Sequence, residues 1–564
     1  MPAACTRQRH PVAFRSCPGL GRHHSSPELT PPAHKPSLPL YPKPLAMRMA
    51  DGAAAHTRPG IEQVYREVIN VMRRHGAQAV AQRVLQELWG DYKDNEAFLR
   101  RAPWLQMLLV KWALQDTRVN LTMGPVHEPY TQAVHNRLLN KLWYVDQLAT
   151  SQAPPPGAIW RLLRRIMHCQ FEFQRGITWG FLRWPALLEQ LPPGHGARGL
   201  FVQAMGMQPE PYMDLAVALF SVVHEQGPTV SVPTLLPLRR HYGADFNHFM
   251  GLFARTLPEL RDALRQQPAL RTRGVAELHE FPYLQRYPLL SLGDGHLQTW
   301  HPIIFTRGLE NAVHHRLTDL GSAYTESYSK LFERYVTDLV LRPFPYAITE
   351  DQYRQMCGAA GKVVEVAVPF GDCNVLIEAK QSLFHDDVVL VDDPTVLSHK
   401  TERVRTAIKQ GVGVGIDVRR PASTLHGSLG RAAVDFLIVV TNRDLLLVSG
   451  DHMQRLTPHI PLVPPNSPGT AHLPLHHIFI VDIADFEVLM GAVAEGKVHL
   501  PDLLRRAAQG NLSITEGSVR LSDHINWNTT PRPDVPLLYT ASERARERVF
   551  ANLRSTRQSE LGSP

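Results

Sequence analysis

A carboxylate and an ammonium stand two residues apart at the end of residues 362–380, which read KVVEVAVPFGDCNVLIEAK. The valines of this stretch predict a first strand, PFGD predicts a turn, and the apolar run that follows predicts a second strand buried on both faces. Glu378 and Lys380 then project to the same side, because residues i and i+2 of a strand do so. A buried carboxylate without a partner is costly. The pair is therefore either a buried ion pair or a catalytic site that combines a metal ion with a lysine.

This hairpin resembles the core of the PD-(D/E)xK nucleases, which have the restriction-endonuclease-like fold. Glu378-Ala379-Lys380 matches the E-x-K element of that family. The resemblance implies that Glu378 and an acidic residue of the first strand bind Mg²⁺ or Mn²⁺, and that Lys380 positions and activates water. These residue types suit that chemistry, because Mg²⁺ takes carboxylate oxygens, lowers the pKa of a bound water and stabilises charge on phosphate. A nearby ammonium adds positive charge where the transition state becomes anionic.

The chain departs from the family pattern on the first strand. Val364-Glu365 occupies the place of the usual Pro-Asp. Glu365 is a carboxylate on the predicted strand and is our first choice as metal ligand, and Asp372 at the turn is the rival. Where neither reaches the metal, the resemblance implies an inactive relative. Because an E-x-K triplet alone is a weak signal, a salt-bridged sheet edge in another α/β domain is the alternative.

A helix that precedes the hairpin could supply a third carboxylate. Apolar residues at helical spacing over 324–339 predict this helix, and Glu333 lies beside its apolar face. In the nuclease family such a helix often contributes an acidic residue, so the resemblance implies that Glu333 is a metal ligand. The alternative is an exposed glutamate paired with Lys330 or Arg334.

A second helix is predicted after the hairpin, over residues 398–410. In the exonuclease-like branch of the family this helix begins a Q-x-x-x-Y element near the site. Gln410 matches the Gln, whereas Val414 stands where the Tyr would be. The glycine-rich residues 411–415 follow a helix and lack the Lys-Ser/Thr of a phosphate-binding loop, which predicts a flexible connector.

The length and composition indicate several domains. The chain has 564 residues and a net charge of +8, of which the proline-rich residues 1–60 carry +6. We predict a disordered basic tail over 1–60, a helical domain over 61–270 and a connecting region with short strands over 271–320. The nuclease-like domain is predicted over 321–510, and a C-terminal extension with a helix over 511–564. The predicted fold class is an α/β nuclease core, with a mixed sheet flanked by helices, after a mostly α-helical N-terminal region.

Arginines alternate with aromatic residues in one predicted helix of the N-terminal region, over residues 157–175. Such a pattern could clamp phosphates and stack bases. The alternative, which we favour, is an amphipathic helix with a solvated basic face.

The sequence predicts neither a transmembrane helix nor a secretory signal, because it has no 18-residue apolar run and no apolar segment at its N-terminus. The five cysteines are scattered without a C-x-x-C pair, which argues against a zinc ribbon or a disulfide framework and favours a cytoplasmic protein. No membrane partner is therefore expected.

The resemblance implies a metal-dependent nuclease that hydrolyses phosphodiester bonds of nucleic acid, with DNA favoured over RNA. By analogy it suggests a role in bacterial defence against mobile DNA. The helical region would recognise the substrate or a protein partner. The alternative function is a catalytically inactive nuclease-like scaffold or nucleic-acid-binding module.

Overall fold

The computed structural model describes residues 60–90, 95–122, 128–145, 156–174, 179–266, 274–293, 295–357, 363–381, 386–464, 468–513 and 517–561. All of them belong to one compact unit, His56–Pro564. The predicted tail, 1–60, lies outside the described residues except for Gly60. The domain boundaries predicted at 270, 320 and 510 stay predictions.

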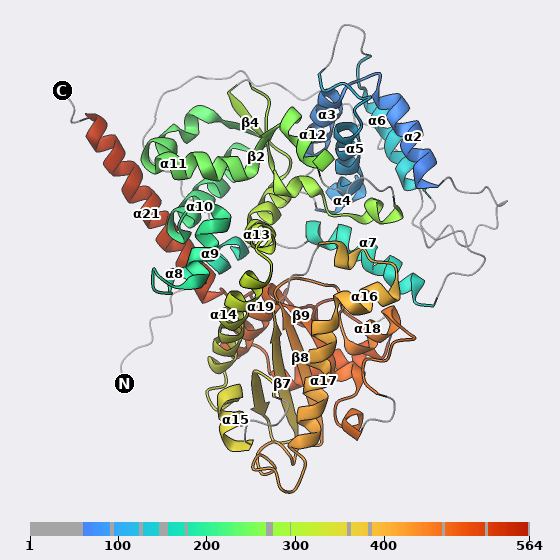
Figure 1. Ribbon diagram of the computed structural model, residues 1–564, viewed down its shortest axis with the longest axis vertical. Coiled ribbons are helices and arrows are strands. Elements are labelled where there is room, and N and C mark those ends of the chain that lie inside the picture. Colours follow the sequence, from blue (N-terminus) through green and yellow to red (C-terminus); the bar gives the residue numbers. More distant parts are fainter. Residues whose placement is uncertain are drawn as a thin grey trace, which may run out of the picture. The chain divides into compact units, whose positions relative to one another are not determined.

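Helices make up most of the described chain before residue 342 (Figure 1). The first helix shows why these segments are helical. Ile61, Val64 and Val68 recur at helical spacing and are buried along one face. The chain between residues 95 and 115 forms two helices rather than one, because Ala102 has a φ of 48° and Pro103 begins the second. The helices of this part are α2 (Ile61–Met72), α3 (Ala77–Gly90), α4 (Asn95–Arg100), α5 (Pro103–Gln115), α6 (Gln132–Trp143), α7 (Ala158–Gln174), α8 (Arg183–Glu189), α9 (Gly196–Met205), α10 (Pro209–Gln226), α11 (Leu236–Phe253), α12 (Leu257–Gln266), α13 (Pro302–Thr318) and α14 (Ser322–Leu341).

A small four-stranded sheet lies among these helices. Its strand order is β1-β4-β3-β2, with bounds Thr229–Ser231, His296–Thr299, Leu289–Ser291 and Ala254–Thr256. The strands β3 and β4 fall in the region where short strands were predicted, whereas β1 and β2 were not predicted. Each of these strands has only three or four residues, too few to give a clear alternating pattern.

The five-stranded sheet holds the predicted hairpin. Its order is β5-β6-β7-β8-β9, in which β5 to β7 pair antiparallel and β7 to β9 pair parallel. Seven of the eight residues of β7 are buried, as a central strand requires. The predicted mixed α/β fold with flanking helices is confirmed at this level. The strands are β5 (Ile348–Thr349), β6 (Val366–Pro369), β7 (Cys373–Lys380), β8 (Val434–Thr441) and β9 (Ile478–Asp482).

Helices cover both faces of this sheet (Figure 1). On one face α14 contacts β7, and Ile377 and Phe332 belong to the same apolar core. On the other face α17 contacts β7 and β8, and Leu376 shares a core with Ile408. The other helices of this half are α15 (Glu350–Cys357), α16 (Pro394–Lys400), α17 (Glu402–Asp417), α18 (Gly450–Leu456), α19 (Ile483–Ala494), α20 (Leu500–Asn511) and α21 (Pro536–Leu561). None of the described helices is both long enough and apolar enough to cross a membrane.

The favoured prediction for helix 157–175 is wrong. The side chains of Arg161, Arg164 and Arg165 on α7 are buried rather than solvated. They contact segments of the C-terminal half, as when Arg164 donates to the carbonyl of Leu445 at 2.7 Å. The partners of Arg164 are backbone carbonyls far away in the sequence, which the helix sequence does not reveal. The charges of the helix alone therefore predicted a solvent-exposed face.

The prediction of a flexible connector over 411–415 is also wrong, because these residues continue α17. A Cβ at Gly411 would lie 2.7 Å from a methyl group of Leu437, and one at Gly415 would lie 2.8 Å from Asp435. The glycines therefore let the helix approach β8 closely, and they do not mark a loop.

We predict that Gly411→Ala lowers the free energy of unfolding by about 1–3 kcal/mol, because the added methyl group overpacks a closed core. Gly199→Ala in α9 is the matched control, since nothing lies within 4 Å of its added methyl group. There the higher helix propensity of Ala should raise the free energy of unfolding by up to about 1 kcal/mol. Urea unfolding measures both variants, and stabilisation of both would contradict the close approach.

Candidate active site

Three glutamates stand in a row across three neighbouring strand ends. The antiparallel pairs nearest to them are Thr349 with Val366 and Val366 with Ile377. One residue further, the same register sets Glu350 opposite Glu365 and Glu365 opposite Glu378. The backbone amide of Glu350 donates to the carbonyl of Glu365 at 2.9 Å, which continues the ladder. Residues opposite each other in antiparallel strands share one face, so these glutamates form what we call the carboxylate row.

Lys380 lies beside this row. Its Nζ atom forms an ion pair with Oε1 of Glu378, as the two-residue spacing on one strand predicts. The Glu378 side chain is only 2% exposed, whereas that of Lys380 is 17% exposed. The second oxygen of Glu378, Oε2, is buried and has no hydrogen-bond partner. The ammonium thus reaches the rim of the site, and one carboxylate oxygen is left for another ligand.

The carboxylate row raises the pKa values of its own members. Burial raises the pKa of Glu378 to about 7, against the opposing effect of the Lys380 ammonium. Burial also raises the pKa of Glu365 well above its usual range, and repulsion from Glu378, Glu333 and Glu350 adds to this. Glu365 and Glu378 therefore each favour a proton or another cation nearby.

Glu333 approaches the row from α14. It is half-buried, and burial raises its pKa, with the Lys380 ammonium opposing this effect and Glu350 adding to it. Arg403, at the start of α17, also favours the charged form of Glu333. The predicted residues Glu333, Glu365, Glu378 and Lys380 are thus brought together.

Two predicted site residues lie elsewhere. Asp372 is at the opposite end of β7 from Lys380, where it is exposed and forms an ion pair with Arg505. Gln410 is half-buried on α17, and its Oε1 atom accepts no hydrogen bond within the described chain. Its neighbour Gly411 faces Leu437, which pairs with Leu376, two residues before Glu378. Of the two rivals for the first strand, the structure places Glu365 and not Asp372 beside Glu378.

Two polar residues of the site were not predicted. Glu350 begins α15, where Thr349 and Gln352 cap the helix reciprocally, and Arg354 donates to its carboxylate at 2.8 Å. Gln381 follows Lys380, and its Oε1 accepts a hydrogen bond from Ser329 of α14. The cap could have been found from the spacing of Thr and Gln. The position of Glu350 beside Glu365 could not have been found from the sequence, because it depends on the pairing of β5 with β6.

The donor set fits a hard divalent cation. In the described ranges, no three side chains of His, Cys, Asp or Glu are already grouped as a metal site. The orphaned, buried Oε2 of Glu378 nevertheless has Glu365 directly across the strands, and both are carboxylates of the kind that Mg²⁺ and Mn²⁺ prefer. Glu365 and Glu378 could therefore hold such an ion, with Glu333 as the nearest further carboxylate on another element.

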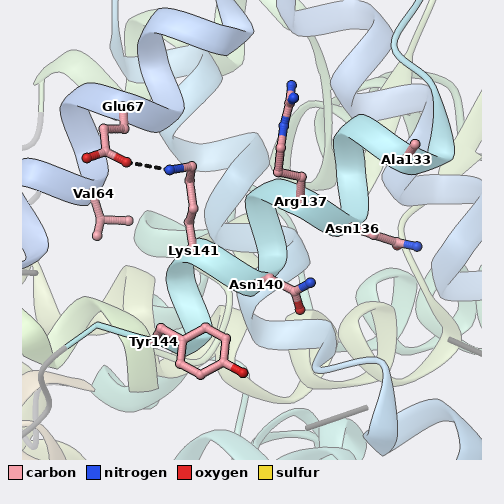
Figure 2. A pocket seen from close by; sticks show the side chains of 8 residues that line it. All are labelled: Val64, Glu67, Ala133, Asn136, Arg137, Asn140, Lys141 and Tyr144. Carbon is pink, nitrogen blue, oxygen red and sulfur yellow. Dashed lines mark hydrogen bonds and ion pairs between the residues drawn. The ribbon is translucent and has the colours of Figure 1, made fainter. Parts of the chain in front are cut away.

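A surface hollow of about 600 Å³ lies between α2 and α6 (Figure 2). Its one carboxylate, Glu67, forms an ion pair with Lys141, which holds the pKa of Glu67 below its usual range. No residue of the row lines this hollow. The row is therefore the better candidate for an active site. The hollow is lined by Val64, Glu67, Ala133, Asn136, Arg137, Asn140, Lys141 and Tyr144.

Comparison of the chain with protein-family models, with curated proteins and with solved structures finds no match. The chemistry of the site therefore has to be judged from its own residues and their geometry.

Without a divalent metal, we predict that the protein loses stability as the pH rises through about 7. The pKa of Glu378 is about 7 in the folded protein, against an ordinary value of 4.5. The folded state thus keeps a proton that the unfolded chain has lost, and a stabilisation of about 3 kcal/mol, present below pH ~4.5, disappears above pH ~7. Glu378→Gln cannot ionise, so its stability should fall less over this range.

Calorimetric unfolding in the presence of a chelator, at several pH values between about 5 and 8, measures this difference. Asp372→Asn is the control, because Asp372 is an exposed carboxylate at the other end of the same strand. If Glu378→Gln and the parent protein lose stability in parallel, the buried, protonated Glu378 is ruled out.

Proposed function

We propose that the protein is a Mg²⁺- or Mn²⁺-dependent nuclease that hydrolyses phosphodiester bonds. One observation carries this proposal: Glu365 faces Glu378 across β6 and β7, and Lys380 extends beside them to the rim. A structural ion pair needs one carboxylate and one ammonium. Here Glu378 is buried and Glu365 half-buried, and the one ammonium that pairs with Glu378 leaves these two carboxylates with excess negative charge, which favours a cation.

In this mechanism Glu365 and Glu378 would hold the ion through their carboxylate oxygens. The ion would supply a lowered pKa for water and positive charge toward the phosphate. The Lys380 ammonium orients the attacking water and lies where charge develops on the phosphate oxygens. Glu333 stabilises the positive charges from the α14 side. Burial excludes bulk water from Glu378, which strengthens these interactions.

Cations near the row support nucleic acid as the substrate. Lys330 and Arg403 are exposed and close enough to favour the charged form of Glu333. Exposed lysine and arginine side chains beside a site can bind the phosphates that flank the scissile bond. These contacts fit the phosphates of DNA and of RNA equally. DNA is the first substrate to test and RNA the second.

We predict that the protein cleaves plasmid or single-stranded DNA in Mg²⁺ or Mn²⁺, and that Glu378→Gln lowers the turnover by at least about 10²-fold. Lys380→Ala should lower it by a similar factor, because the ammonium is lost from the site. Gel assays of purified variants, with single-turnover rates, provide the measurement.

Asp372→Asn is the matched control for these rates, and it should stay within about twofold of the parent because it lies at the far end of β7. Cleavage that survives unchanged in Glu378→Gln and Lys380→Ala would remove the proposed site. If the protein binds nucleic acid well but cleaves none of these substrates, the nuclease-like scaffold is the better description.

Metal affinity should increase with pH. Since Glu378 has a pKa of about 7, Mn²⁺ has to displace a proton below that pH, and the affinity should fall by up to about tenfold per pH unit. Calorimetric titration with Mn²⁺ in buffers of different ionisation heat measures both the affinity and the protons released. Glu365→Gln should bind Mn²⁺ more weakly, and Asp372→Asn should bind it as the parent does. A pH-independent affinity would contradict the assignment of Glu378 as a ligand.

A further inference from the structure

The α7 helix carries a buried guanidinium that is bonded to main-chain oxygens. The side chain of Arg164 has no exposed surface. Its Nε and Nη2 atoms donate to the carbonyl of Leu445 at 3.0 and 2.7 Å, and its Nη1 atom donates to the carbonyl of Val388 at 3.0 Å. A planar fork that donates in two directions fixes the distance between its two acceptors.

The two acceptors lie on the segments that leave β7 and β8. Val388 belongs to η6 (Asp386–Val389), which follows Lys380 in the chain, and Leu445 lies four residues after Thr441. Lys380 and Thr441 are partners in the parallel register of these two strands. Arg164 therefore joins the exits of two neighbouring strands at the edge that holds the candidate site. In Figure 1, α7 lies next to α18, and the two helices are in contact.

The segment after β8 is strained. Leu446 and Val448 have φ values of 48° and 60°, which lie in the left-handed region. Side chains other than Gly rarely adopt that region, and a β-branched Val does so least readily, unless the surroundings hold the backbone there. The bonds from Arg164 to Leu445 are part of those surroundings, and so is the bond from the Leu446 amide to Asp444 at 2.9 Å.

We propose that Arg164 is a positioning residue for the candidate active site, which holds the exits of β7 and β8 and through them Lys380. This inference rests on the proposed nuclease function. Lys380 is the last residue of β7 and pairs with Thr441, the last residue of β8, so the described link from Arg164 to Lys380 runs through residues 441–445. A displacement of about 1 Å at a reacting group can lower a rate by about 10²-fold. The helical region thereby contributes to the geometry of the site without touching it.

The test compares Arg164→Lys with Arg183→Lys. Arg183 is a half-buried arginine of the helical region, and its Nε and Nη2 atoms bind Glu487 of α19 at 2.6 and 2.8 Å rather than the segments after β7 and β8. The lysine in both variants keeps the positive charge but lacks the planar guanidinium that donates in two directions. For each variant we would measure the turnover and KM on DNA with saturating Mg²⁺, the melting temperature, and hydrogen exchange over residues 386–391 and 443–449.

We expect Arg164→Lys to lower the turnover by about 10- to 100-fold with little change in KM, and to speed exchange in both segments. Arg183→Lys should keep its turnover within about twofold. Equal losses in the two variants, or an unchanged turnover in Arg164→Lys, would overturn the proposal. If Arg164→Lys does not fold, Asp444→Ala loosens the same strained segment from its other side and should give the same loss of turnover.

Hydrogen exchange also separates this proposal from the proposed function. If the wild-type protein cleaves nothing, the nuclease proposal fails, but the exchange rates of the two segments still decide whether Arg164 holds them. Unchanged exchange in Arg164→Lys would refute the positioning role whatever the activity.

Discussion

Placing several carboxylates in a row on one sheet face is the constraint on which the rest of the site depends. Each glutamate of the row loses hydration on burial and repels its neighbours, and the raised pKa of Glu378 and of Glu365 follows from these two effects. Lys380 is the one ammonium that contacts Glu378, and Arg354 pairs with Glu350, so the three glutamates hold more negative charge than these two cations offset. A proton or a bound cation has to supply the remaining positive charge. The pH dependence of stability and the affinity for metal are therefore two consequences of a single arrangement.

The row exists only in one register. A slip of one residue between β6 and β7 would turn Glu378 toward α14 and bury it in an apolar core. The turn at Gly371, with a φ of 84°, and the valines of β6 help to prevent this slip. The neighbouring register, between β7 and β8, is fixed by a polar contact, because Asn374 donates to Asp435 of β8 at 2.7 Å, and Arg419 binds the same carboxylate. A buried polar pair of this kind is satisfied in one alignment only. Both registers are thus specified at the end of β7 that lies opposite the site.

The sequence predicted the part of this arrangement that depends on local spacing. The strand–turn–strand pattern and the two-residue step from Glu378 to Lys380 are local, and the structure contains both. The position of Glu350 depends on β5, a strand of two residues, which has no pattern to detect. Asp372 remained a rival because sequence distance does not show that it lies at the other end of β7. The glycines of α17 suggested a loop because their purpose, close contact with Leu437, involves a partner 26 positions away.

The arginines of α7 show why charge patterns alone mislead about the helical region. Arg161 and Arg165 bind Asp392, and Arg164 binds carbonyls, so none of the three faces the carboxylate row. Their positive charge is used within the contact between α7 and the C-terminal half. It follows that this contact can change the shape of the site but does little to balance its charge. The charge balance has to come from Lys380, from Arg354 on Glu350, from the cations near Glu333 and from a bound ion. Mutations in α7 and mutations in the row should therefore change different properties, the first geometry and the second metal and proton binding.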